Sequence, residues 1–213
     1  MTSGIASSEP IRVIVIDDHP IVREGIAALL GRETDLVCVG EGASGDEAID
    51  LFRSLSPDVT LIDLQMPTMS GIDAIIAIRA IDATARIIVL TTYPGDAQVM
   101  RAIRAGASGY LLKNSVRKEL LDAIRSVHAG RSVLGADIAH EVALHALDEP
   151  LSEREVEVLR LVANGHANKV IAWRLALSVD TIKAHLKAIF SKLGVNDRTH
   201  AVTVATRRGY LDP

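Results

Sequence analysis

The stretch that decides the fold reads Ile11-Arg12-Val13-Ile14-Val15-Ile16-Asp17-Asp18. Its first six residues are mostly β-branched and nearly all apolar, which predicts a short strand buried on both faces rather than a helix. The strand ends abruptly at two adjacent carboxylates. A buried strand that carries acidic side chains at its carboxyl end is typical of a parallel α/β sheet, in which ligands bind at that edge.

Further strand candidates follow in the first half of the chain, at residues 36–39, 59–62, 86–90 and 109–112. Helical stretches separate them, at about residues 21–30, 46–55, 71–80, 97–105 and 116–129, with Ser44 and Ser115 as expected N-caps. Because right-handed crossovers join parallel strands, this alternation predicts a doubly wound five-stranded parallel sheet, an α/β fold.

Polar side chains stand where four of these strands end. They are Asp17 and Asp18 after the first strand, Asp63 after the third, Thr91 after the fourth and Lys113 after the fifth. Since the carboxyl ends of parallel strands meet at one edge, we expect these groups to converge there. Clustered carboxylates repel one another unless a cation lies among them. Mg²⁺ suits such a site because it takes few protein carboxylates and keeps positions for water and phosphate oxygens.

Asp63 is the expected nucleophile of this site. It ends a central strand, and the loop after it contains Pro67 and Gly71, which we expect to leave room for a phosphoryl group. Attack of the Asp63 carboxylate on phosphorus would give an aspartyl phosphate. The Lys113 ammonium would balance the charge of the phosphoryl oxygens, and the Thr91 hydroxyl would donate to one of them.

Other candidates for chemistry are weaker. His19 follows the acidic pair directly, but no second histidine is near it in sequence and Pro20 makes it an ordinary helix entry, so we do not expect a metal ligand or phosphoacceptor. Cys38 is the only cysteine, which excludes an intramolecular disulfide and a cysteine-based zinc site.

No apolar run approaches the roughly 20 residues that cross a bilayer, and residues 1–10 lack the features of a secretory signal. The expected compartment is therefore the cytoplasm.

The second part of the chain differs in charge and in pattern. Residues 1–150 carry 13 basic and 21 acidic side chains, a net charge of −8, whereas residues 151–213 carry 10 and 6, a net charge of +4. From Leu151 every stretch has helical periodicity, beginning with a capping box of Ser152 and Glu155. Further helices are expected at about residues 168–175, from Ser178 or Asp180 to 193, and at about 198–208. This part is predicted to be an all-α four-helix domain.

The third helix of this domain, expected from Ser178 or Asp180 to residue 193, has two distinct faces. At 100° per residue its apolar side chains form one narrow stripe, made of Ile182, Leu186, Ile189 and Leu193. The opposite face carries Lys183, Ala184 and Lys187. Two lysines one turn apart, with a small side chain between them, can lie in the major groove of DNA. The pattern predicts a recognition helix.

Residues 11–129 resemble the receiver domain of two-component response regulators. The resemblance is carried by Asp17-Asp18, Leu61-Ile62-Asp63-Leu64-Gln65-Met66-Pro67, Thr91 and Gly109-Tyr110-Leu111-Leu112-Lys113. It implies a flavodoxin-like fold and phosphorylation by a sensor histidine kinase. The metal ligands that it implies are Asp18, Asp63 and the backbone carbonyl of Gln65, with Asp17 acting through water. It further implies that Thr91 and Tyr110 form a switch pair, in which the hydroxyl turns toward the phosphoryl group and the aromatic ring moves inward.

Residues 151–195 resemble the LuxR-type helix-turn-helix. The motifs are Leu151-Ser152-Glu153-Arg154-Glu155, Asn164-Gly165, Asn168-Lys169-Val170-Ile171-Ala172, Thr181-Ile182-Lys183-Ala184-His185-Leu186 and Lys192-Leu193-Gly194-Val195. With the receiver, they make the chain similar to the NarL/FixJ family of transcription regulators. The implied contacts are Lys183, Ala184 and Lys187 with base edges, and Asn168, Lys169, Thr181 and Lys192 with phosphates. The last helix would form a homodimer on inverted half-sites of double-stranded DNA. Ala167 and Trp173 depart from the polar or basic residues usual in the family.

These expectations combine into one interpretation with alternatives. The expected divisions are a tail at residues 1–10, a receiver at 11–130, a helical linker at 131–150 and a helix-turn-helix domain at 151–213. The interpretation is a response regulator, not an enzyme. A magnesium phosphatase is one alternative, but such enzymes usually place nucleophile and acid two positions apart on the first strand, whereas Asp17, Asp18 and His19 are consecutive. A DNA-binding protein that ignores phosphorylation and uses its receiver only to dimerise remains open.

Overall fold

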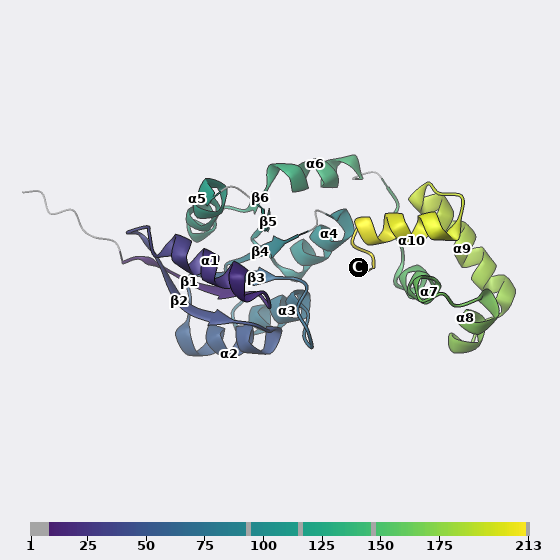
Figure 1. Cartoon of the computed structure of the whole chain (residues 1–213), viewed down its shortest axis with the longest axis horizontal. Coiled ribbons are helices and arrows are strands. Elements are labelled where there is room, and N and C mark those ends of the chain that lie inside the picture. Colours follow the sequence, from purple (N-terminus) through teal and green to yellow (C-terminus); the bar gives the residue numbers. More distant parts are fainter. Residues whose placement is uncertain (1–8, 93–94, 115–116, 146–147, 212–213) are drawn as a thin grey trace, which may run out of the picture. The chain divides into compact units, whose positions relative to one another are not determined.

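The computed structural model describes residues 9–92, 95–114, 117–145 and 148–211. Within these ranges the chain folds as two compact units, one built mainly from residues up to Ile138 and one built mainly from residues after it (Figure 1). Each unit has its own hydrophobic core. The expected tail falls largely on residues 1–8, and the expected N-cap Ser115 also lies outside the described residues.

The first unit is a parallel sheet with helices between its strands. The strands are β1 (Ile11–Ile16), β2 (Leu36–Gly42), β3 (Val59–Asp63), β4 (Ile87–Thr91), β5 (Gly109–Leu112) and β6 (Val133–Leu134), in the spatial order β2-β1-β3-β4-β5-β6. The helices are α1 (Pro20–Leu30), α2 (Gly45–Leu55), α3 (Gly71–Ile81), α4 (Asp96–Ala105) and α5 (Arg117–His128), followed by α6 (Ala136–Leu144). The predicted doubly wound α/β fold is confirmed.

The sixth strand corrects the prediction of five. β6 lies in the stretch expected to be a purely helical linker, where it pairs in parallel with β5. The Val133 N–H donates to the Ser108 carbonyl over 3.0 Å, and the Gly135 N–H donates to the Tyr110 carbonyl over 2.9 Å. A strand of two residues has no periodicity of its own, so only its pairing with a distant segment makes it visible.

Alternating side chains of the sheet face two different layers of helices. Val13 and Val15 of β1 pack in one core with residues of α1 and α5, among them Leu30 and Ile124. Successive side chains on a strand point to opposite faces, so Ile14 lies on the other side, where α2 and α3 run side by side (Figure 1). The last four residues of β1 are all buried, and burial of each such side chain contributes about 1.5–3 kcal/mol. This explains why the opening stretch forms an interior strand of the sheet.

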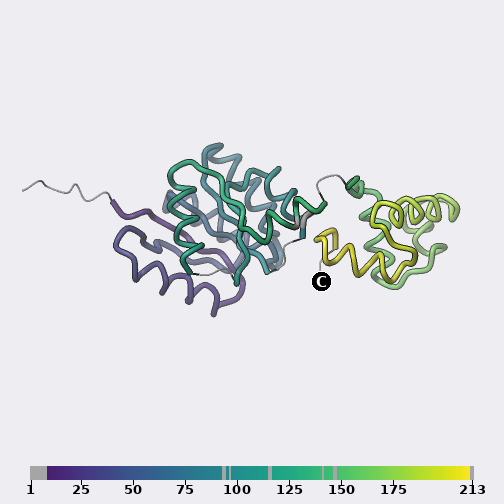
Figure 2. Tube along the Cα trace, turned by 90° about the horizontal axis from the view of Figure 1, so that it is seen from above, coloured from purple at the N-terminus to yellow at the C-terminus, as the bar shows by residue number. Residues whose placement is uncertain are grey.

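The second unit contains four helices around a separate core. They are α7 (Glu153–Ala163), α8 (Asn168–Arg174), α9 (Val179–Leu193) and α10 (Arg198–Arg207), traced in green to yellow in Figure 2. The predicted capping box is present, because the Ser152 side chain accepts from the Glu155 N–H while the Glu155 carboxylate accepts from the Ser152 N–H. Ser178, rather than Asp180, caps α9, and Gly194 ends it in the left-handed conformation at φ 64°.

The turn between α8 and α9 is tied to α7. Arg154 donates from its guanidinium to the carbonyl of Leu175 over 2.9 Å, directly after α8 ends. Ala176 then adopts a positive φ of 53°, which redirects the chain into α9. The two helices therefore have a defined mutual orientation, as a helix-turn-helix requires. Among the described residues of both units, no helix is long and apolar enough to cross a membrane.

Candidate functional site

The order of the strands places the acidic residues together. β1 and β3 are neighbours although β2 lies between them in sequence, so the chain reverses its winding direction at this point. Ligands of doubly wound sheets bind at such a switch point, beyond the carboxyl ends of the strands. Asp17 directly follows β1, and Asp63 is the last residue of β3. Lys113 follows β5, and its Nζ lies 2.7 Å from Asp17 Oδ2 and 2.8 Å from Asp63 Oδ2.

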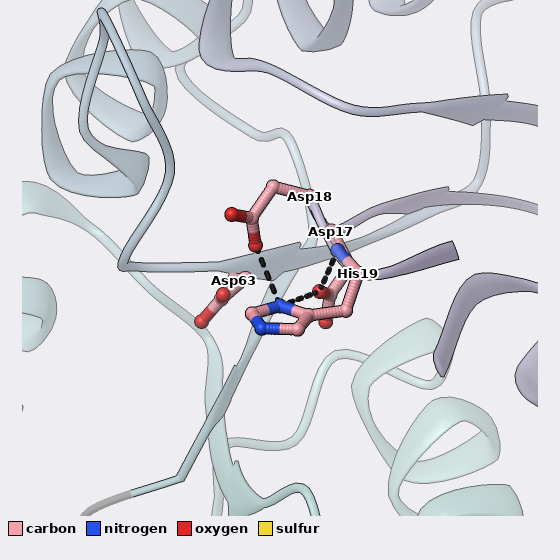
Figure 3. Close-up of side chains that lie close together, drawn as sticks. All are labelled: Asp17, Asp18, His19 and Asp63. Atoms are coloured by element: carbon pink, nitrogen blue, oxygen red, sulfur yellow. Dashed lines mark hydrogen bonds and ion pairs between the residues drawn. The ribbon is translucent and has the colours of Figure 1, made fainter. Parts of the chain in front are cut away.

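The three predicted carboxylates form one cluster. Asp17 and Asp63 are 1% and 3% exposed, and one side-chain ligand atom from each of Asp17, Asp18, His19 and Asp63 lies within 4.8 Å of all the others (Figure 3). Asp18 Oδ1 is buried and accepts no hydrogen bond of good geometry. A buried carboxylate oxygen without a donor is costly. With one lysine serving the two buried carboxylates, these oxygen atoms fit a divalent cation, so the pocket is compatible with metal binding.

The pKa of the Asp63 carboxyl is raised. Burial is the largest cause, and the charge of Asp17 adds to it, while hydrogen bonds from Lys113 and from the Gln65 backbone N–H act in the opposite direction. Burial alone would lower the pKa of Lys113, but its contacts with Asp17 and Asp63 raise the value overall. The lysine therefore stays charged, whereas ionised Asp63 lacks enough compensation in the pocket. A further cation or an electrophile next to Asp63 would stabilise the negative charge of its carboxylate.

Gly71 has a different role from the expected one. We expected it to leave room for a phosphoryl group, but a β-carbon at this position would lie 2.0 Å from the carbonyl oxygen of Asp63. Its N–H donates to the Leu64 carbonyl over 3.0 Å, and Ser70 caps the helix that starts here. The missing side chain thus permits close packing of α3 against the end of β3. The absence of a side chain at Gly71 therefore allows a close backbone contact after Asp63 and does not leave an open space there.

Thr91 and Tyr110, the predicted switch pair, lie on neighbouring strands. β4 and β5 pair in register, with Val89 opposite Tyr110, and both Thr91 and Tyr110 are 1% exposed. Burial raises the pKa of the Tyr110 phenol, and the nearby Thr91 hydroxyl partly opposes this. The ring of Tyr110 therefore occupies an inward position next to Thr91.

His19 also lies in the pocket, although the sequence did not predict a role for it there. Its Nδ1 is 2.7 Å from Asp18 Oδ1 and 3.2 Å from Asp17 Oδ1 (Figure 3). The residue is the N-cap of α1, but its side chain makes no capping hydrogen bond. The only signal in the sequence was its position directly after the acidic pair. The lack of a second histidine nearby in sequence does not reveal this contact, because the partners of His19 are carboxylates.

The predicted recognition face of α9 is exposed. Its apolar stripe of Ile182, Leu186, Ile189 and Leu193 is buried in the core of the unit. Lys183, Ala184 and Lys187 lie on the opposite, exposed side. Lys183 pairs with Asp180 over 2.9 Å, and both side chains are largely exposed, so the pair is weak and easily exchanged for another anion. The helix thus presents two lysines and a small residue on one accessible face.

Comparison with known families agrees with both halves of this description. The family described as "Response regulator receiver domain" matches residues 13–125, and the family described as "Bacterial regulatory proteins, luxR family" matches residues 149–205. The chain belongs to the LuxR-type response regulators. It is therefore a DNA-binding transcription regulator of the two-component class and not an enzyme.

Similar proteins span nearly the whole response regulator. The transcriptional regulatory protein YxjL of Bacillus subtilis is 41% identical and covers 96% of this chain and 99% of its own. The response regulator protein VraR of Staphylococcus aureus is 39% identical, with 94% and 99% coverage. A solved structure of RcsB from Salmonella enterica serovar Typhimurium, bound to the promoter P1flhDC with the phosphomimetic BeF3⁻, has a TM-score of 0.72 at 30% identity. It covers 93% of this response regulator and 99% of the RcsB chain.

Lys192 is the clearest disagreement with the predicted DNA contacts of this response regulator. Its Nζ lies 2.9 Å from Glu155 Oε2 and 3.0 Å from Glu149 Oε1, and it donates to the Pro150 carbonyl. The side chain is only 15% exposed. Its charge is therefore neutralised inside the domain, which argues against a phosphate contact. These partners are distant from Lys192 in the sequence, so its position near the end of a helix does not predict them.

The other expected phosphate contacts lie at the starts of the two helices of the helix-turn-helix. Asn168 and Lys169 begin α8, and Lys169 is exposed. The Thr181 hydroxyl shares a hydrogen bond of 2.8 Å with Ser178 at the start of α9. Trp173, the departure from the family pattern, is 80% exposed, so it adds a bare indole to this surface rather than a core residue.

Proposed function

We propose that this response regulator accepts a phosphoryl group on Asp63 from a sensor histidine kinase, and that this event controls its binding to DNA as a dimer. The observation that carries the proposal is the contact of Asp63 with Lys113 inside a buried acidic pocket. The raised pKa of Asp63 supports it, because this carboxylate is stabilised by fewer donors than its burial demands.

The transfer itself needs few protein groups. An oxygen of the Asp63 carboxylate forms a bond to phosphorus while the phosphorus–nitrogen bond of a kinase phosphohistidine breaks. The electron pair stays on the imidazole nitrogen, which then takes up a proton. Lys113, 2.8 Å from Asp63 Oδ2, neutralises the oxygens of the incoming phosphoryl group. Mg²⁺, when held by Asp18, Asp63 and the Gln65 carbonyl with Asp17 next to them, would supply further charge neutralisation.

The signal would leave the pocket through Thr91 and Tyr110. We propose that the Thr91 hydroxyl donates to a phosphoryl oxygen and that the buried Tyr110 ring packs behind it. Support comes from their positions on the neighbouring strands β4 and β5, two residues apart in register, and from the burial of both side chains. Interiors are densely packed, so a rotated hydroxyl and an inward ring favour one arrangement of the surrounding elements over another.

On the DNA side, we propose that Lys183, Ala184 and Lys187 read base edges in the major groove. Asn168, Lys169 and Thr181 would contact phosphates, while Lys192 is left out of this set. The exposed side of α10 would join two copies on inverted half-sites. A solved structure of the relative RcsB contains two dimers bound to two parallel DNAs, which supports the proposal that the present protein also binds DNA as a dimer. We expect the protein to act in the cytoplasm, where its DNA target lies.

The divisions of the chain follow from these roles. We propose that the receiver includes β6, so that it extends somewhat beyond residue 130. The linker then comprises α6 and the residues up to 150, and the DNA-binding domain begins at Leu151. Support comes from the hydrogen bonds that tie β6 to β5.

A phosphorylation assay tests the proposal. The full chain is incubated with a small phosphoryl donor and Mg²⁺, and acid-labile phosphate is measured by intact mass. Wild type and the exposed control variant Asp50→Asn should gain one phosphoryl group, and Asp63→Asn should gain none. Stoichiometric acid-labile phosphate on Asp63→Asn would overturn the assignment.

DNA affinity separates the proposal from its alternative. Binding of wild-type protein to a promoter fragment is measured with and without BeF3⁻, at fixed salt concentration. Tighter binding with BeF3⁻ supports control by phosphorylation. Equal binding would favour a receiver that serves only for dimerisation.

A further inference from the structure

His19 occupies a position that capping does not explain. The N-cap of a helix is usually a residue whose side chain accepts from a backbone N–H of the first turn. His19 is the N-cap of α1, yet its side chain makes no such hydrogen bond, and its own N–H donates to Asp17 Oδ1 over 2.9 Å. The imidazole instead turns back toward the acidic pocket (Figure 3).

The imidazole nitrogen lies at the spacing of a metal ligand. Its Nδ1 is 3.2 Å from Asp17 Oδ1 and 2.7 Å from Asp18 Oδ1, and with Asp63 these ligand atoms are all within 4.8 Å of one another. In octahedral coordination with bonds of about 2.1 Å, ligand atoms lie about 3.0 to 4.2 Å apart. Small side-chain movements would therefore bring the His19 nitrogen and three carboxylates around one ion. The His19 side chain is 66% exposed, so the ring can move without disturbing the core.

A nitrogen ligand changes which ions the pocket favours. Carboxylate, carbonyl and water oxygens suit Mg²⁺ and Mn²⁺ alike, whereas an added imidazole nitrogen raises affinity for first-row transition-metal ions, in the order Mn²⁺ < Fe²⁺ < Co²⁺, more than for Mg²⁺. Asp18 Oδ1 is buried, has no hydrogen bond of good geometry, and lies 2.7 Å from His19 Nδ1. An ion bound between the imidazole and this oxygen would coordinate both atoms.

We infer that His19 is a direct ligand of the divalent ion in the receiver pocket and makes the pocket select Mn²⁺-like ions over Mg²⁺. The inference rests on the proposed function, because it assumes that the pocket binds a divalent ion. The imidazole binds the ion through the lone pair of Nδ1, with the ring proton on Nε2. Asp18, Asp63 and the Gln65 carbonyl contribute the oxygen ligands, and Asp17 acts through water.

Metal titration of the full chain tests the inference. Mn²⁺ and Mg²⁺ are titrated separately into wild type, His19→Ala, His19→Gln and the exposed control His140→Ala, with circular dichroism to verify folding. Loss of the imidazole should weaken Mn²⁺ binding roughly tenfold and Mg²⁺ binding by a much smaller factor. Gln should not restore the Mn²⁺ affinity, because it can hydrogen-bond Asp18 but offers no nitrogen ligand.

Pulsed electron paramagnetic resonance of bound Mn²⁺ gives an independent readout. Wild type and His140→Ala should show coupling to an imidazole nitrogen, and both His19 variants should lose it. Mn²⁺ that binds wild type without this coupling, or an equal loss of affinity for both ions in His19→Ala, would overturn the role of His19 alone. If neither ion binds wild type, the metal pocket of the proposed function fails as well.

Discussion

Each unit of this response regulator contains a buried carboxylate beside a lysine, and the two pairs behave in opposite ways. Asp63 and Lys113 are 2.8 Å apart in the receiver, and Glu155 and Lys192 are 2.9 Å apart in the DNA-binding domain. The carboxylates are 3% and 5% exposed. Nevertheless the pKa of Asp63 is raised, whereas the pKa of Glu155 is lowered despite its burial.

The difference lies in how far the donors around each carboxylate offset its desolvation and the charge of neighbouring acidic groups. Glu155 accepts from the Ser152 backbone N–H over 2.7 Å and from Lys192, which outweighs its desolvation. Asp63 shares Lys113 with Asp17, so two buried carboxylates depend on one ammonium. A buried charge pair stabilises a fold only when its remaining hydrogen-bonding capacity is satisfied. One pair therefore stabilises a domain, whereas the other belongs to an acidic pocket whose charge is only partly compensated and which is compatible with a cation.

Removal of Lys192 should give the largest effect on this comparison. Lys192→Ala leaves Glu155 buried without its cation, and we expect a loss of about 2 kcal/mol, less than for a fully buried pair because this lysine is 15% exposed. The measurement is urea unfolding of the full chain, followed by fluorescence of Trp173, the only tryptophan. A stability equal to that of wild type would remove the structural role of the pair.

Lys187, on the same helix, should behave in the opposite way. It is exposed, so Lys187→Ala should change the free energy of unfolding by no more than about 0.5 kcal/mol. Loss of a base contact should weaken promoter binding by about 1–2 kcal/mol in a fluorescence anisotropy titration. Unchanged DNA affinity would contradict the recognition face. Lys192→Ala, measured at a temperature where it stays folded, should bind nearly as wild type does.

Neutralisation of Asp63 should stabilise the receiver when no divalent ion is present. A raised carboxyl pKa contributes stability below the unfolded pKa, and this is lost as pH rises through the folded pKa, so ionised Asp63 weakens the fold at neutral pH. Asp63→Asn should therefore gain about 1 kcal/mol in thermal unfolding followed by circular dichroism. Mg²⁺ should raise the Tm of wild type and of Asp50→Asn but not of Asp63→Asn. A less stable Asp63→Asn protein would show that the pair with Lys113 is structural.

The smallest expected effect is the acid response of Glu155. Its lowered pKa means that its contribution to stability is present above the unfolded pKa and is lost as pH falls through the folded value. The urea midpoint reported by Trp173 should therefore fall as pH drops from about 5 toward 3, and Glu155→Gln should show a shallower fall. An identical pH dependence in both proteins would exclude Glu155 as the source.

Much of the molecule could be predicted from local patterns. β1 and β5 begin and end at the predicted residues, and the capping box of Ser152 and Glu155 is present. The convergence of Asp17, Asp63 and Lys113 followed from a general property of parallel sheets, whose strand ends share one edge. The exposed face of α9 followed from helical periodicity in the same way.

By itself, therefore, the opening run from Ile11 to Asp18 determined a buried strand and an acidic edge, because both depend on residue type and spacing within a few positions. Other features depend on contacts between segments far apart in the chain, which no local pattern encodes. β6 is a strand because it pairs with β5, and glycine is needed at position 71 because the chain packs closely against Asp63 there. Lys192 is mostly buried because it pairs with Glu155. The same holds for His19, whose contacts with Asp17 and Asp18 depend on the direction in which its imidazole points. Only the tertiary structure could decide these, because burial and the number of donors around a charge are properties of the folded chain.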